Sequence, residues 1–163
     1  MNDKHNNIIA IVLALLLILS TSWVIYKQIQ EHYTKDDPKL KEMKKIFEDF
    51  FKQDRYWNAP LDMLNKTNIM EEIEMYRGNK SYTINKEKIY ICLKDENGNY
   101  FNNNMLIYVI AHEISHVICT EIGHTELFQN IFEELLQELT KAKIYNPSIP
   151  IDQNYCEDGD PEM

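Results

Sequence analysis

The sequence contains little glycine, proline or cysteine, and fewer basic than acidic residues. Glycine occurs 4 times and proline 5 times in 163 residues, which excludes a collagen-like or linker-dominated chain. The 17 Lys and Arg residues are outnumbered by 26 Asp and Glu, giving a formal net charge of −9. Surfaces that bind nucleic acid need clustered positive charge, so we expect no nucleic-acid partner. With 44% hydrophobic residues, the length predicts one folded domain with a modest core.

The three cysteines are Cys92, Cys119 and Cys156. Their wide spacing gives neither a C-x-x-C pair nor a disulfide framework. At most one bridge can form among three cysteines, and free thiols are the simpler interpretation. The cysteines therefore leave the redox compartment undecided.

Charge is absent from residues 8–26, a run of 19 apolar or uncharged positions. As a helix, this run spans roughly the ~30 Å hydrocarbon core of a bilayer. A cleavable signal peptide is the alternative, with an apolar core ending at Leu19 and with Ser20 and Ser22 before the cut. Because the apolar run continues past these serines to Tyr26, we favour a retained single-pass anchor in the lipid bilayer over secretion after cleavage.

The side of the membrane that the following domain occupies stays open. Lysines are more numerous after the apolar run than before it, which favours a cytoplasmic domain. The glycosylation triplets at Asn65 and Asn79 would instead suit a lumenal one, although such triplets arise easily by chance in an Asn-rich chain.

The remaining pattern predicts an α+β fold, in which a compact domain follows the transmembrane helix. Apolar residues recur at helical spacing from Leu40 to Phe51, and residues 56–77 are mixed, with a short helix. We expect a small antiparallel sheet from residues 81–85 and 88–93, a central metal-binding helix from about Asn102 to Gly123, and a last helix over residues 125–143. The expected organisation is a tail and anchor (1–27), a linker (28–37), the domain (38–146) and an acidic tail (147–163).

The most informative string is His112-Glu113-Ile114-Ser115-His116. Residues four apart share one face of a helix, so both imidazoles can bind one metal ion. Glu113 can take a proton from a metal-activated water without being a ligand. Two histidines and a glutamate in an otherwise apolar helix would be costly to bury without a charged partner. The string therefore predicts a catalytic Zn²⁺ site, rather than core histidines satisfied by hydrogen bonds.

A catalytic zinc needs a third protein ligand. The spacing of the candidate residues from His116 eliminates some of them. The pattern H-E-x-x-H-x-x-G-x-x-H would require glycine and histidine where this chain has Cys119 and Ile122. A glutamate about 20 residues beyond the second histidine would fall on a leucine. His124 is favoured, because Gly123 before it suits a left-handed turn that reverses the chain. Cys119, one helical turn beyond His116, is the main competitor.

The stretch HEISHVICTEIGHTELF resembles the WLM-type and SprT-like zinc metallopeptidases, which carry H-E-x-x-H, a short connector, a third histidine and an aromatic residue a turn later. The similarity covers roughly Ile89 to Cys156 and is greatest to small membrane-anchored members encoded by large DNA viruses. The connector is longer here than in many WLM sequences. The resemblance implies a zincin-like fold with His112, His116 and His124 as ligands and Glu113 as general base. The DNA-repair role of several relatives is not expected in an acidic, membrane-linked chain.

These observations lead to one favoured function and two alternatives. The favoured one is a membrane-anchored zinc endopeptidase that acts on a protein or peptide substrate. An edge strand at residues 88–93 would hold an extended peptide, and Tyr145 or Tyr155 could stabilise an oxyanion, although each is more simply structural. The first alternative is a catalytically inactive zinc-binding membrane adaptor. The second is a structural membrane protein in which the motif occurs by chance.

Overall fold

The computed structural model describes residues 2–53, 55–152 and 155–156. These residues fall into two compact units, which are divided between Thr34 and Lys35. The acidic tail expected over residues 147–163 lies mostly outside the described residues. The expected linker, residues 28–37, is helical as far as Lys35. The second unit combines helices with a small sheet, which agrees with the predicted α+β class.

The first unit is one long helix, α1 (Asn2–Lys35). Its segment Ile8–Gln28 is long and apolar enough to cross a bilayer, a property that a signal sequence shares. The hydroxyl of Thr21 donates to the carbonyls of Leu17 and Ile18, each at 3.0 Å. These bonds satisfy the Thr21 hydroxyl within its own helix. A hydroxyl in an apolar environment needs such a partner.

The second unit begins with α2 (Pro38–Phe51), which lays one apolar face on the core. Its N-cap is Asp37, whose carboxylate accepts from the backbone N–H of Lys39 at 2.9 Å and of Leu40 at 3.4 Å. Pro38 suits the first helical position. A backbone N–H there would have no partner within the helix, and proline carries none. The short helices η1 (Asp62–Asn65) and α3 (Ile69–Glu72) follow.

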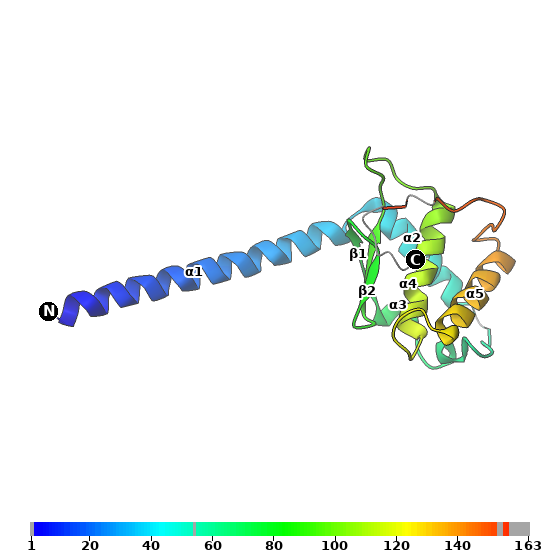
Figure 1. The fold of residues 1–163 in the computed structure, drawn as a ribbon, viewed down its shortest axis with the longest axis horizontal. Helices are drawn as coiled ribbons and strands as arrows, with labels where there is room; N and C mark the ends of the chain where they lie inside the picture. The colour runs from blue at the N-terminus through cyan, green and yellow to red at the C-terminus, as the bar shows by residue number, and fades with distance from the viewer. Residues whose placement is uncertain (1, 54, 153–154, 157–163) are drawn as a thin grey trace. The chain divides into compact units, whose positions relative to one another are not determined.

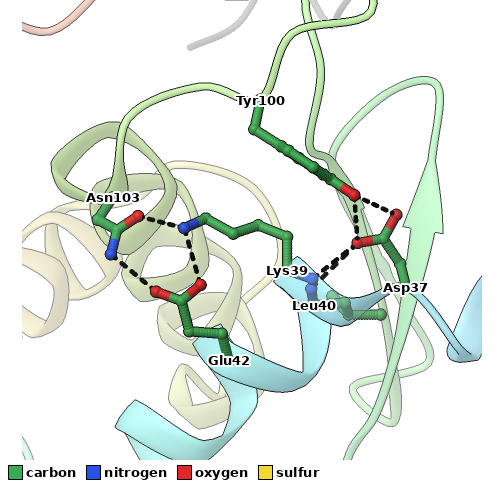
Figure 2. A network of polar contacts seen from close by, with 6 residues as sticks. All are labelled: Asp37, Lys39, Leu40, Glu42, Tyr100 and Asn103. Atoms are coloured by element: carbon green, nitrogen blue, oxygen red, sulfur yellow. Dashed lines mark hydrogen bonds and ion pairs between the residues drawn. The ribbon is translucent and has the colours of Figure 1, made fainter.

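Asp37 also joins the start of α2 to distant parts of the unit (Figure 2). The Tyr100 hydroxyl donates to both of its carboxylate oxygens, at 3.2 and 3.3 Å. The Arg77 guanidinium lies 3.3 Å from Oδ2. A second set of contacts links Lys39 and Glu42 of α2 to the Asn103 side chain. Asp37, which is 5% exposed, thus fixes α2 against the sheet and the segment before the central helix.

We expect Asp37→Ala to destabilise the second unit by about 2 kcal/mol, because it removes a helix cap together with buried charged hydrogen bonds. Thermal unfolding followed by circular dichroism measures this loss. Asp36→Ala is the matched control, since the neighbouring Asp36 pairs with Lys41 on the exposed surface and should change stability by less than about 0.5 kcal/mol. Equal losses in the two variants would contradict the structural role of Asp37.

The sheet contains β1 (Glu74–Gly78), β2 (Tyr82–Ile84) and β3 (Lys88–Cys92) in the order β1-β3-β2. β2 and β3 pair antiparallel as predicted. β1, a strand that was not predicted, pairs parallel with β3, so the whole sheet is mixed. Residues 88–93 were expected to form an edge strand, whereas β3 is central and β2 lies at an edge. Asn85 and Lys86, both at positive φ, form the tight turn between β2 and β3.

The central helix α4 (Asn103–Ile118) lies between the sheet and α5 (Glu126–Lys141), as Figure 1 shows. The side chain of Asn102 caps α4 by accepting from the Met105 N–H at 2.9 Å. The helix was expected to end near Gly123, but it ends at Ile118, and the backbone of Cys119 is extended. Gly123 instead has a φ of +84° in the loop that leads to α5.

The interpretation of all three cysteines as free thiols is wrong. Cys92 and Cys156 form a disulfide, with Cα atoms 6.6 Å apart, and Cys119 is the free and buried cysteine. The bridge attaches the end of the described chain to the central strand. Next to it, the Tyr155 hydroxyl donates to the Cys92 carbonyl.

Candidate metal centre and its cleft

Three histidine rings converge on one point beside the sheet. His112 and His116 come from successive turns of α4, and His124 comes from the loop that follows. The Nε2 atom of His112 lies 3.2 Å from Nε2 of His116 and 3.1 Å from Nε2 of His124. The predicted triad is therefore brought together. Cys119, the predicted competitor, is not part of this group of converging ligand atoms.

These spacings fit a tetrahedral metal site. Ligand nitrogens at ~2.0–2.1 Å from a zinc ion, in tetrahedral directions, lie about 3.3 Å from one another. Hydrogen bonding alone accounts poorly for three converging Nε2 atoms. A neutral ring nitrogen has either one proton or one lone pair, so Nε2 of His112 can form a well-directed hydrogen bond with only one of the two nitrogens that lie close to it. A bound cation accepts all three lone pairs at once.

Aromatic packing holds the rings in place. Phe128 of α5 stacks on His116, with ring centroids 4.3 Å apart, and meets His112 and His124 edge-on at 4.9 and 4.8 Å. Phe132 contacts the far side of His112 at 5.2 Å. The fully buried Phe128 thus forms a rigid floor under the triad.

Burial also sets the charge state of His112. Burial, assisted by the neighbouring His116 and His124, lowers the pKa of His112 to about 3. The ring of His112 is therefore neutral at physiological pH, with a nitrogen lone pair available to a metal. A histidine whose environment disfavours protonation in this way is suited to binding a cation.

Glu113 points its carboxylate towards the sheet. The side chain is 3% exposed, and its Oε2 accepts a hydrogen bond of 2.7 Å from the Thr83 hydroxyl on β2. Glu113 is therefore next in sequence to His112 and is held by a hydrogen bond from β2.

A cleft of about 420 Å³ opens over the triad. Its walls are the edge strand β2 with the following turn, the HExxH turn of α4, and residues 121–124. Ile122 stands at the rim and is 93% exposed, although it is apolar. An open cavity of this size leaves room for a water and a substrate beside the three nitrogens.

Neither tyrosine considered as an oxyanion donor lines this cleft. Tyr145 packs against Tyr108. The Tyr155 hydroxyl bonds the Cys92 carbonyl and Ser81, and burial raises the pKa of Tyr155. Both rings therefore have structural contacts away from the triad.

Two cleft residues were missed by sequence reasoning. Thr83 bonds Glu113, and the Lys86 ammonium bonds the Cys119 carbonyl just after α4. Alternation along residues 81–84 could have indicated that Thr83 faces inward while Tyr82 faces outward. Nothing in the local sequence indicates that this strand lies against the HExxH helix.

Comparison with known proteins finds viral relatives. Uncharacterized protein 136R of Invertebrate iridescent virus 6 is 48% identical over 99 residues, covering 59% of this chain and 56% of that protein. Uncharacterized protein 042R of Invertebrate iridescent virus 3 is 38% identical over 99 residues, covering 60% and 62%. Uncharacterized protein R325 of Acanthamoeba polyphaga mimivirus is 40% identical over 67 residues, covering 40% and 34%.

The chain thus spans about three fifths of the first two relatives and a third of the last. No family model matches the chain, and no solved structure matches it. The names of the relatives state no activity, so a functional argument has to start from the geometry of the cleft.

Proposed function

We propose that this protein is a membrane-anchored zinc metallopeptidase of the zincin type, similar to WLM and SprT-like enzymes. His112, His116 and His124 hold the metal, and Glu113 is the general base. The observation that carries the proposal is the convergence of three Nε2 atoms in an open cleft that the buried Glu113 also lines.

Zinc suits this set of donors better than the hard cations do. Ca²⁺ and Mg²⁺ prefer oxygen ligands, whereas neutral imidazole nitrogens suit zinc and later transition metals. When bound, zinc supplies Lewis acidity, which polarises a carbonyl and lowers the pKa of water. The three histidines leave one tetrahedral position for that chemistry.

The chain's own residues then divide the remaining work. A carboxylate oxygen of Glu113 accepts the proton of the attacking water and later delivers it to the nitrogen of the departing amine. β2, as an edge strand beside the triad, holds an extended peptide by backbone hydrogen bonds, the role first expected of residues 88–93. The apolar Ile122 at the rim offers contact to a side chain of that peptide.

An inactive zinc-binding adaptor is the main competing function. Structural zinc sites have four protein ligands and no open position. Among the described residues, three side chains form the group of ligand atoms, and the cleft above them is open. The buried, hydrogen-bonded Glu113 has no purpose in a structural site. These features favour the enzyme.

The proposal includes the membrane. The segment Ile8–Gln28 anchors the protein in the lipid bilayer as a single pass, so that substrates are proteins at or near the membrane surface. The net charge of −9 supports a protein rather than a nucleic-acid partner.

Zinc content and peptide hydrolysis by the full-length protein in detergent micelles test the proposal. We expect about one zinc per chain and zinc-dependent cleavage of unstructured peptides, abolished by a chelator and restored by added zinc. His124→Ala should weaken zinc binding by more than about 100-fold. Cys119→Ala should retain the metal, which separates the two candidate third ligands. Folded protein that takes up no zinc, or stoichiometric zinc without hydrolysis, would contradict the proposal.

A further inference from the structure

We propose that Thr83, on the edge strand of the cleft, is a positioning residue for Glu113. The inference rests on the proposed peptidase function and adds to it a residue outside the HExxH motif. The Thr83 side chain joins β2, the strand proposed to hold the substrate, to Glu113, the residue proposed to move the proton. The substrate-binding strand and the general base are thereby placed relative to each other by one hydrogen bond.

The contact distances identify the acceptor. Thr83 Oγ1 lies 2.7 Å from Oε2 of Glu113 and 3.2 Å from the Glu113 carbonyl oxygen. A hydroxyl has one proton to donate, and the shorter contact directs it to the carboxylate. A hydrogen bond of this length to a charged oxygen is stronger than one between neutral groups. Oε2 is therefore held by a donor on β2.

The hydrogen bond from Thr83 limits the conformations that the Glu113 side chain can adopt. A glutamate side chain loses up to about 2 kcal/mol of rotamer entropy when it is fixed. Proton transfer requires its oxygen within hydrogen-bonding reach of the attacking water, and misplacement by about 1 Å can cost 10²-fold in rate. Thr83 restricts the carboxylate before substrate arrives.

The strand that carries Thr83 is itself held at both ends. Before it, Ser81 Oγ accepts from the Cys92 N–H at 2.9 Å and lies 2.7 Å from the Tyr155 hydroxyl. Tyr155 is adjacent to Cys156, which is disulfide-bonded to Cys92. After the strand comes the tight turn at residues 85–86. The donor is thus supported by the central strand and by the end of the described chain.

The test measures kcat and KM separately for full-length, zinc-loaded variants with a peptide substrate. Thr83→Val keeps the shape of the side chain without the hydroxyl, and Thr83→Ser keeps the hydroxyl without the methyl group. We expect Thr83→Val to lower kcat by about 10–100-fold, with KM within about twofold and one zinc per chain. Thr83→Ser should recover kcat to within about threefold of the wild type.

Thr140→Val is the matched control, because its hydroxyl bonds the Leu136 carbonyl on α5 and does not line the cleft; we expect wild-type kcat. Should Thr83→Val fail to bind zinc, the same comparison is made between Thr83→Ala and Thr83→Ser. Unchanged kcat without the hydroxyl, or no recovery in Thr83→Ser, would overturn the positioning role while the wild type remains active. A zinc-loaded wild type that cleaves no peptide would instead overturn the proposed function, and this inference with it.

Discussion

Glu113→Gln is expected to leave zinc binding intact and to reduce peptide hydrolysis by about 10³-fold or more. Glutamine matches the size of glutamate, and its amide oxygen can still accept from Thr83, so the cleft should keep its shape. The amide cannot take a proton from water, and a positioned general base contributes typically 10²–10⁴-fold. Steady-state kinetics on protein with a measured zinc content gives the ratio of kcat/KM to the wild type.

Glu126→Gln provides the matched control for this experiment. Glu126 is an exposed carboxylate in the first turn of α5, outside the cleft lining, and its loss should leave kcat/KM within about twofold. The pair of variants therefore separates loss of one negative charge from loss of the base. Retention of most activity in Glu113→Gln would exclude Glu113 as the base, whatever the metal content.

Replacement of both Cys92 and Cys156 by serine is expected to lower the free energy of unfolding by about 4 kcal/mol. The bridge spans a sequence separation of 64, and the loss of chain entropy on closing a loop of that size gives this estimate. Urea unfolding monitored by circular dichroism, without reductant, measures the difference. The lost stability should appear as a lower midpoint.

Reductant supplies the internal control for the disulfide. A thiol reductant should bring the wild type to the stability of the double variant and leave the double variant unchanged. Cys119→Ala, which removes the buried free thiol, should keep the full response to reductant. A wild type that is insensitive to reductant under conditions that expose the bridge would show that the bond does not form.

The helices and the triad follow from local patterns in the sequence. The 3.6-residue period and the capping side chain of Asn102 located the start of α4 and both ends of α5 closely, whereas the end of α4 was expected too far along the chain. Two histidines four residues apart share a helical face whatever the rest of the fold does. His124 was favoured through the glycine before it, and the structure gives Gly123 the positive φ expected, although in a loop and not at the helix end.

The features that sequence reasoning missed depend on contacts between distant residues. Alternation along residues 88–92 indicates a strand but not its neighbours, so the parallel pairing with β1 and the central place of β3 were not foreseen. The pairing of Cys92 with Cys156 depends on where the end of the chain packs. The bond between Thr83 and Glu113 joins residues 30 positions apart. The local pattern of apolar and polar residues cannot predict such a contact.

The disulfide between Cys92 and Cys156 makes part of this protein a covalent ring. The ring contains α4, the loop with His124, and α5, and therefore every member of the triad. A single cut anywhere inside it by a protease would leave both fragments joined. On a gel without reductant such a nicked molecule would migrate near the intact chain. Integrity of this protein has to be judged after reduction.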